Sequence, residues 1–275
     1  MPDYVMIILI VFGIAVGLGL LNLLVYFLFF VRPRSKVPAE KALLCDYAHR
    51  GLHGGGVPEN SLRAFALACE GGHGIELDVQ LSRDGEVMVF HDYTLERMTG
   101  DKRRLCELSA EELSEQHLAG TEEVIPSFSQ VLRLVDGRVP LLIELKGEDL
   151  NTALCAKVAA FLKDYKGAYC VESFNPLLLR VIQKELPGVY CGLLYTNVVR
   201  DKKNGSPLHR VLSLMALNFA CKPNFIAYNE LDRHALPVRL ATGLYRAPKF
   251  VWTIRSREAL ERAHAEGECA IFEKI

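Results

Sequence analysis

The chain has 275 residues, half of them hydrophobic, and a formal net charge of −1. This length is more than most single domains need and is the usual size of one α/β barrel, so the chain can bury a sizeable core. The near-neutral charge excludes a general electrostatic argument for nucleic-acid binding, because such proteins carry a basic face, and we expect no nucleic-acid partner.

The first feature along the chain is an apolar run without a charged residue, from residue 4 to residue 31. A helix needs about 20 apolar residues to cross the hydrocarbon layer of a membrane, and this run is longer. A secretory signal would have Lys or Arg before a shorter apolar core and small residues after it, whereas Asp3 precedes this run and aromatic residues end it. We therefore predict a retained transmembrane helix over residues 1–31. The GxxxG spacing of Gly13 and Gly17 allows two such helices to pack together, as in a homodimer.

Residues 32–43 carry four basic side chains and two prolines, and we predict a short linker here. Because positive charge tends to stay on the cytoplasmic side of a membrane, the pattern predicts a single-pass protein of the cell membrane whose following domain, residues 44–275, faces the cytoplasm. The eight cysteines agree with a reducing compartment. No CxxC spacing occurs, and most cysteines lie within apolar patterns, as reduced core residues do.

Beyond the linker, short strand-like runs alternate with helical patterns. The predicted strands are residues 43–49, 74–81, 86–92, 140–146, 168–174, 189–195, 225–230, 250–255 and 268–272. The predicted helices are residues 61–70, 109–118, 128–135, 150–165, 176–186, 208–220 and 257–265. This alternation is typical of a parallel sheet with helices packed outside it. Because no Gly-x-Gly-x-x-Gly motif occurs, we predict a closed (β/α)8 TIM barrel, an α/β fold, rather than an open doubly wound sheet.

Charged side chains share one face of two predicted strands. Glu76 and Asp78 alternate with apolar residues, and Glu144 and Lys146 do the same on a later strand. In a parallel barrel one face lies under helices and the other points inward, so inward carboxylates would repel each other unless a cation lies between them. Oxygen ligands of this kind suit one hard cation, Mg²⁺ or Ca²⁺. Two alternatives are a polar strand face turned to water and an internal Glu–Lys pair.

Titratable side chains also stand at the ends of two predicted strands, His49 with Arg50 and His91 with Asp92. The active site of an α/β barrel lies at the C-terminal ends of its strands. Two histidines suit proton transfer near neutral pH, and arginine and lysine suit a phosphate. The four glycines in residues 51–56 are expected to let backbone lie close to a bulky ligand. Together these groups predict metal-assisted cleavage of a phosphate ester.

The motifs occur in a recognisable order. They are His-Arg-Gly at 49–51, Pro-Glu-Asn at 58–60, Glu-x-Asp at 76–78, Asp-Gly to His-Asp at 84–92 and Glu-x-Lys at 144–146. In this order they resemble the glycerophosphodiester phosphodiesterase family, and the resemblance covers nearly everything after residue 44. It implies a TIM barrel that uses a divalent metal to hydrolyse glycerophosphodiesters to glycerol 3-phosphate and an alcohol.

The resemblance also implies roles for single residues. Glu76, Asp78 and Glu144 would hold the metal ion. His49 and His91 would exchange protons with the nucleophile and with the leaving oxygen. Whether water or the substrate's own glycerol hydroxyl is the nucleophile stays open.

Further roles follow by the same resemblance. Arg50 and Lys146 would contact the substrate phosphate. Glu59 and Asn60 would help to order the first loop. The segment from residue 93 to about residue 126 would form the family's small insertion over the barrel mouth.

Two later segments also resemble the family, and two positions near them depart from its usual pattern. Phe174 and Trp252 belong to segments that resemble the family's and are candidates for substrate contact. Arg255 stands where the family usually has Asn, and Glu273 stands where it usually has Asp. Arg255 would either contact an anionic head group or be solvated.

Two alternatives to glycerophosphodiester hydrolysis stay open. The first is hydrolysis of lysolipids in the manner of a lysophospholipase D, because the predicted anchor holds the site near lipid. The second is a catalytically silent barrel that binds a phosphodiester or a metal.

Overall fold

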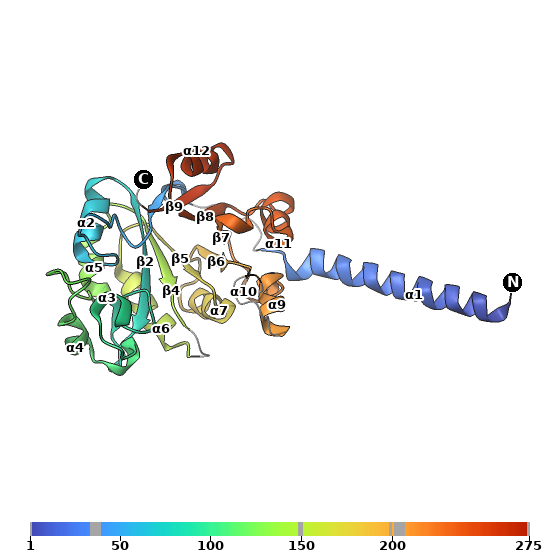
Figure 1. Cartoon of the computed structure of the whole chain (residues 1–275), viewed down its shortest axis with the longest axis horizontal. Helices are drawn as coiled ribbons and strands as arrows, with labels where there is room; N and C mark the ends of the chain where they lie inside the picture. Colours follow the sequence, from blue (N-terminus) through green and yellow to red (C-terminus); the bar gives the residue numbers. More distant parts are fainter. Residues whose placement is uncertain (1, 34–39, 148–150, 198–199, 201–206, 274–275) are drawn as a thin grey trace.

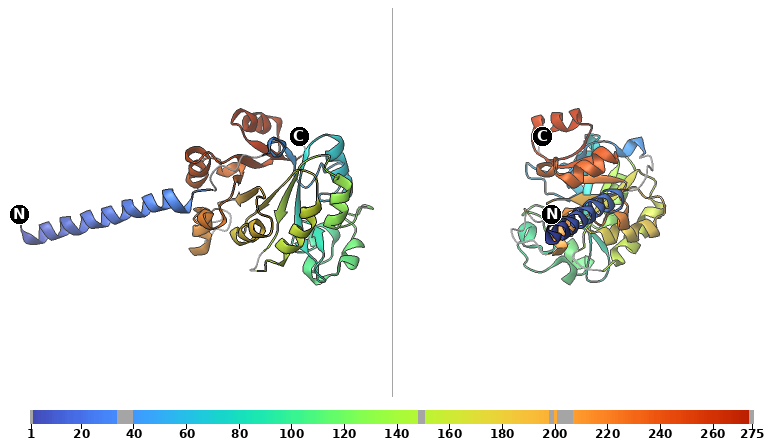
Figure 2. Two further views of the ribbon diagram at one scale, coloured as in Figure 1. Left: turned by 180° about the vertical axis from the view of Figure 1, so that it is seen from behind. Right: turned by 90° about the vertical axis from the view of Figure 1, so that its right-hand side faces the viewer.

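The computed structural model describes residues 2–33, 40–147, 151–197, 200 and 207–273. A long apolar helix, α1 (Asp3–Val25), continues into the π-helical turn η1 (Tyr26–Phe30) and projects from a barrel (Figure 1). Together α1 and η1 span 28 residues, long and apolar enough to cross a membrane. Figure 2 shows that only one end of this helix meets the barrel. Of the predicted linker, residues 34–39 lie outside the described residues.

Eight parallel strands form a closed barrel within the part of the chain that the structure describes. They are β1 (Tyr47–Ala48), β2 (Gly74–Leu81), β4 (Leu141–Leu145), β5 (Tyr169–Ser173), β6 (Cys191–Tyr195), β7 (Phe225–Asn229), β8 (Lys249–Ile254) and β9 (Cys269–Phe272). Each strand pairs with the next in this order, and β1 also pairs with β9, which closes the barrel. The predicted TIM barrel is therefore confirmed. The predicted strand 86–92 differs, because β3 (Val87–Val89) runs antiparallel to β2 and stays outside the barrel.

Helices cover the outside of the barrel. The longer ones are α2 (Leu62–Glu70), α5 (Phe128–Val135), α6 (Ala153–Asp164), α7 (Pro176–Glu185), α9 (Pro207–Ser213) and α12 (Arg257–Ala265). Short ones are η2 (Lys41–Leu43), α10 (Asn218–Cys221), η4 (Glu230–Asp232), α11 (Leu236–Arg239) and η5 (Leu240–Leu244). Polar side chains start several of them: Ser61 accepts a hydrogen bond from the Ala64 amide, and Asn175 accepts one from Leu177. The predicted helix 208–220 is interrupted between α9 and α10, where Met215 has a positive φ of 50° that a right-handed helix cannot contain.

Large aromatic side chains fill the barrel interior near the N-terminal ends of its strands. The rings of Phe225 and Phe250 lie 4.2 Å apart between centroids, and Tyr47 packs on Phe250. Gly192 leaves room for this packing, because a Cβ atom there would lie 2.0 Å from the Phe225 ring. This half of the barrel interior is therefore filled by its own core, and the interior leaves room for a ligand at the C-terminal ends of the strands.

An insertion between β2 and α5 contains β3, α3 (Glu96–Thr99), η3 (Leu105–Glu107) and α4 (Ala110–Ser114). It has an apolar core of its own, which includes Leu95, Leu105 and Leu113. α4 is shorter than the predicted helix 109–118, since residues 117 and 124 instead form an isolated β-bridge. The insertion packs beside the C-terminal end of β2, where the Arg83 amide donates to the carbonyl of Leu108.

Candidate active site

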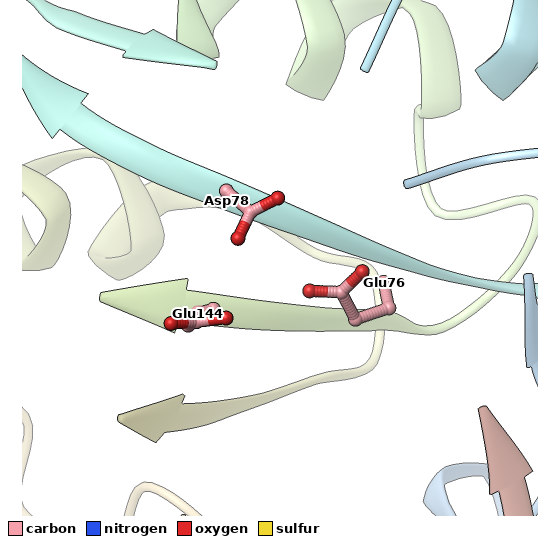
Figure 3. Close-up of side chains that lie close together, drawn as sticks. All are labelled: Glu76, Asp78 and Glu144. Atoms are coloured by element: carbon pink, nitrogen blue, oxygen red, sulfur yellow. The ribbon is translucent and has the colours of Figure 1, made fainter. Parts of the chain in front are cut away.

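Three carboxylates meet inside the C-terminal half of the barrel. Glu76 and Asp78 come from β2 and Glu144 from β4, and all three are buried (Figure 3). The register places Asp78 directly opposite Glu144. One oxygen of each carboxylate lies within 4.8 Å of the others. The inward face predicted from strand alternation is therefore the face on which these groups lie.

Burial and the neighbouring charges shift the pKa values of these three carboxyls. Burial raises the pKa of Glu76 well above its ordinary value, and the charges of Asp78 and Glu144 add to this. Burial also raises the pKa of Glu144 to about 7, although Lys146 lowers it in part. Burial would raise the pKa of Asp78 too, but the charge of Lys146, with smaller effects of His91, Arg50 and the Asn60 hydrogen bond, outweighs it and holds that pKa well below the usual range. The cluster thus combines one carboxyl that ionises more readily than usual with two that ionise less readily.

Two cations lie against the cluster. The Lys146 ammonium is 3.0 Å from a Glu144 oxygen and 3.3 Å from a carboxylate oxygen of Asp78. The internal Glu–Lys pair, which the sequence left open as an alternative, is therefore present. Arg50 approaches from the loop after β1, with its Nε 3.6 Å from Asp78 and its backbone amide donating to Glu76 at 2.9 Å.

Each of the two predicted histidines has a carboxylate at its Nδ1. His49 Nδ1 lies 2.5 Å from Glu273, and His91 Nδ1 lies 2.5 Å from Asp92. An ionised carboxylate can only accept a hydrogen bond, so each Nδ1 donates and each Nε2 stays free to take up a proton. Burial lowers the pKa of both histidines and outweighs the opposing effect of the carboxylates, which keeps the imidazoles neutral near pH 7.

Polar contacts hold the loops that carry these groups. Asn60 donates to Asp78 at 2.9 Å. Glu59 accepts from Arg50 at 2.7 Å and from Arg97 of the insertion at 2.6 Å, which ties the first loop to the insertion. Gln80, the third inward polar residue of β2, donates to three carbonyls of residues 90–92 and so fixes the segment that carries His91.

A cavity of about 210 Å³ opens between these groups at the C-terminal end of the barrel. Its lining includes most of the residues predicted for the site: His49, Arg50, Glu76, His91, Glu144, Phe174, Trp252 and Arg255. The Phe174 and Trp252 rings meet edge to face at 5.7 Å and form an apolar wall. Lys146 lines a neighbouring cavity with Gln80 and Tyr93, and it shares the Asp78 carboxylate with Arg50, the other predicted phosphate ligand.

Backbone conformation and packing explain the glycines of the first loop. Gly51 has a φ of +80°, and a Cβ atom there would lie 2.9 Å from Ala64 of α2. Gly55 and Gly56 also have positive φ, with nothing within 4 Å of an added Cβ. None of these glycines lines the cavity. Their conformations serve the turn and its packing on α2, and the expectation that they let backbone lie close to a ligand stays a prediction.

Three carboxylates of the site were missed or given no role by the sequence prediction. Glu172 on β5 lies opposite Glu144, lines the cavity and is buried, and one of its oxygens has no hydrogen-bond partner. Burial raises its pKa well above the ordinary value, and the charge of Glu76 adds to this. A signal existed, since Glu172 alternates with apolar Val171 as Glu144 does with Ile143. The other two are Asp92 and Glu273, the partners of the histidines.

The chemistry of the cluster fits a hard divalent cation. Three buried carboxylates offer oxygen ligands only, the set that Mg²⁺ and Ca²⁺ prefer. Asp78 Oδ1 is buried and has no hydrogen-bond partner, although the Lys146 ammonium lies 3.3 Å away. A cation between the carboxylates would also stabilise their ionised forms against the burial and the repulsion that raise two of their pKa values.

The comparisons with known proteins agree with this geometry. A model of the glycerophosphoryl diester phosphodiesterase family matches residues 49–272. A glycerophosphodiester phosphodiesterase from Caldanaerobacter subterraneus subsp. tengcongensis is 36% identical over 230 residues, which cover 78% of this chain and 87% of that protein.

The chain belongs to the glycerophosphoryl diester phosphodiesterase family.

Solved structures show the same fold. A phosphodiesterase from Oleispira antarctica, in complex with the product sn-glycerol-3-phosphate, superposes with a TM-score of 0.68 at 22% identity and covers 83% of this chain and 92% of that one. A glycerophosphodiester phosphodiesterase from Thermotoga maritima gives a TM-score of 0.64 at 24% identity, with 83% and 94% covered. The predicted family and its enzyme class, a phosphoric diester hydrolase, are therefore confirmed.

Proposed function

We propose that this member of the family hydrolyses glycerophosphodiesters to glycerol 3-phosphate and an alcohol with one divalent metal ion, Mg²⁺ or Ca²⁺. The observation that carries the proposal is a cluster of three buried carboxylates beside one cavity, which two of them line together with the two carboxylate-held histidines. The Oleispira antarctica relative has sn-glycerol-3-phosphate bound as product, which supports the same product here.

Glu76, Asp78 and Glu144 are the residues that would hold the metal. When bound, the metal supplies positive charge for the oxygens of the reacting phosphate. Arg50, which lines the cavity, would contact the same phosphate. Lys146 remains a candidate for that role but acts first as the partner of Glu144 and Asp78.

His49 and His91 would transfer the protons. A neutral imidazole takes a proton on Nε2 from the attacking hydroxyl, and the second histidine, when protonated, donates from Nε2 to the leaving oxygen. Glu273 and Asp92 hold the two rings through Nδ1 and stabilise their charged forms. The nucleophile is either water or the substrate's glycerol hydroxyl, and a cyclic glycerophosphate intermediate would identify the hydroxyl.

A substrate panel tests the proposal. The full chain, freed of metal with a chelator, should hydrolyse glycerophosphocholine and glycerophosphoethanolamine only after Mg²⁺, Ca²⁺ or Mn²⁺ is added. Metal binding without turnover of any substrate would favour the catalytically silent barrel. Turnover that persists in chelator would contradict the role of the three carboxylates.

A second candidate substrate, a lysolipid, is favoured by one observation. An apolar cavity of about 70 Å³ adjoins the site and shares Phe174 and Leu194 with it, and Leu212 and Met215 line its far side. This cavity would take the first methylenes of an alkyl chain. Leu212→Trp, which fills the cavity, should reduce lysophosphatidylcholine turnover and leave glycerophosphocholine turnover unchanged. An equal effect on both substrates would remove the reason for this candidate.

We also propose that the protein is a single-pass membrane protein with residues 1–31 as a retained anchor, residues 32–43 as linker and the barrel domain, residues 44–275, in the cytoplasm. Val31, at the end of the apolar run, is completely buried in the barrel's main apolar core. Cleavage of residues 1–31 as a signal sequence would remove that core residue. Thiol reagents that cannot cross the membrane should fail to label the barrel in intact cells, and labelling would overturn the topology.

We further propose a homodimer that packs through the GxxxG face of the helix. A Cβ atom added at Gly13 or Gly17 would meet nothing within 4 Å, so both positions are open to a second helix. Disulfide crosslinking through cysteines placed at these positions tests this.

A further inference from the structure

The end of the apolar helix is attached to the barrel by specific contacts. The Asn218 side chain of α10 donates to the Val31 carbonyl at 2.9 Å, and both residues are buried. The Tyr26 hydroxyl donates to the Leu214 carbonyl at 2.7 Å. The Tyr245 hydroxyl donates to the Phe27 carbonyl. Because these bonds come from two separate segments of the barrel domain, residues 214–218 and Tyr245, they fix its orientation relative to the helix axis (Figures 1 and 2).

The barrel surface around this attachment is apolar. Val211, Leu214 and Phe219 are exposed on or beside α9 and α10, and Leu244 is exposed at the end of η5. The Phe219 ring meets Phe30 of η1 edge to face at 5.2 Å. A helix that crosses the membrane thus ends against a domain face that itself exposes apolar side chains, which places this face at the membrane surface.

A groove of about 640 Å³ lies at the same place, between the helix end and the surface of α7 and α10. Leu28, Phe29 and Phe219 supply its apolar side, and Arg32 and Lys222 supply two exposed cations. No acidic side chain of the described residues lines it. Arg32 is also held in place, because its guanidinium lies over the Tyr245 ring, 5.9 Å from the centroid.

We propose that this groove binds an anionic phospholipid of the membrane into which the helix inserts. The acyl chains would lie along Leu28 and Phe29, which continue the apolar helix, and the phosphate would lie between Arg32 and Lys222. The lipid would complete the contact between membrane and barrel and hold the barrel in one orientation. This inference rests on the proposed membrane anchor but not on the proposed reaction, since none of these residues belongs to the active site.

The test measures lipid binding to the full chain in a neutral detergent. Phosphatidylglycerol should raise the unfolding temperature in a saturable way, because a ligand that binds only the folded state stabilises it, whereas phosphatidylcholine should not. Soluble glycerol 3-phosphate serves as a third arm, because it supplies the phosphate without acyl chains. As the proposed product it also stabilises the fold through the active site, so its effect should be the same in the wild type and in a variant that lacks Arg32 and Lys222.

Variants locate the binding. The double variant R32Q/K222Q should bind phosphatidylglycerol about 25-fold more weakly, at roughly fivefold for each cation near an anionic surface. R32K/K222R, which keeps both charges, should bind almost as the wild type does. The matched control K157Q/R257Q removes two exposed cations from α6 and α12, which line no part of the groove, and should bind normally.

Two results would overturn the proposal. One is equal stabilisation by phosphatidylglycerol and phosphatidylcholine, and the other is an equal loss of binding in R32Q/K222Q and in K157Q/R257Q, which would indicate diffuse attraction. Turnover of glycerophosphocholine is measured in the same samples. R32Q/K222Q should retain it, and a wild type without turnover would contradict the proposed reaction while leaving the lipid result unchanged.

Discussion

Metal binding by this protein should depend steeply on pH because of Glu144. Burial raises the pKa of its carboxyl from 4.5 to about 7 in the metal-free protein. A metal binds the ionised carboxylate, so binding must release this proton. For one group with a pKa of about 7, the apparent dissociation constant should rise about 25-fold between about pH 7.5 and about pH 5.5. The pKa of Glu76 is also raised, which makes the dependence steeper in the same direction.

Calorimetric titration of the chelator-treated full chain with Ca²⁺ or Mn²⁺ measures this effect. Near pH 6.5 Glu144 alone should release about 0.8 proton per metal, so the observed heat should change with the ionisation enthalpy of the buffer. Glu144→Gln should weaken binding, because it removes one of three carboxylates, and should also flatten the pH dependence. His91→Ala serves as the control, since its imidazole is not one of the oxygen ligands and its removal should keep the slope.

The same carboxyl should affect the stability of the metal-free protein with a definite sign. Its pKa is higher in the folded than in the unfolded state, so the folded state binds more protons between about pH 4.5 and about pH 7. Stability therefore falls as pH rises through this window, by about 3 kcal/mol for a shift of this size. The pKa values of the two histidines are lowered, so these groups make stability rise with pH. Their contribution is the same in wild type and in Glu144→Gln and drops out of the difference between the two. For metal binding, a heat of titration that does not depend on the buffer, or a metal affinity that stays constant between about pH 5.5 and about pH 7.5, would refute the reasoning.

Four further predictions follow from single contacts. His91→Ala should leave metal affinity nearly unchanged and lower the rate of phosphodiester hydrolysis by about 10²–10⁴-fold, the usual contribution of general acid–base catalysis; near-full activity would exclude this role. Glu273→Gln removes the negative charge at His49 Nδ1 and should slow hydrolysis at least about tenfold. Arg255→Gln should change the rate less than about fivefold, because the exposed Arg255–Glu273 ion pair contributes about 0–1 kcal/mol. Gly192→Ala should lower the free energy of unfolding by about 1–3 kcal/mol or more in a denaturant titration, because the added Cβ would overlap the Phe225 ring. Gly243→Ala is the matched control and should leave the free energy of unfolding nearly unchanged, because its Cβ would meet nothing within 4 Å. A fragment that starts at Lys41 should still unfold cooperatively, since all barrel strands follow it, but at a lower denaturant concentration, because the loss of buried Val31 costs about 2 kcal/mol; recovery of aggregate alone would contradict this.

The strand pattern carried most of the information about the site. Glu76, Asp78 and Glu144 alternate with apolar residues, and alternation is a local property that a sequence shows directly. Once the barrel is recognised, its inward face follows, and so does the meeting of these groups at the C-terminal ends of the strands. The elements of the barrel were predictable for the same reason, and most of their ends differ by only a few residues from the observed ones.

Strand direction was not predictable in this way. The apolar residues of β3 have the same pattern whether the strand runs parallel or antiparallel to β2, and only the short connection after β2 indicated a hairpin. Contacts between distant segments were equally hidden. Glu273 follows β9 and His49 follows β1, and the two meet only because β1 pairs with β9 when the barrel closes.

The two departures from the family pattern, Arg255 and Glu273, are best understood together. Considered singly, Arg255 had the features of a head-group ligand, and the role of Glu273 was open. In the structure Arg255 donates to Glu273 at 2.9 Å, and Glu273 accepts from His49 through its other oxygen. The hydrogen bond with His49 and the charge of Arg255 overcome the effect of burial and hold the pKa of Glu273 at about 2. Glu273 therefore stays ionised at any pH at which the enzyme would act, and the guanidinium already has a carboxylate partner. We therefore propose that the pair orients His49, and that the Phe174–Trp252 wall and the apolar cavity beside it contribute to the choice of alcohol. Because Arg255 also lines the active-site cavity, its contact with a head group stays a prediction.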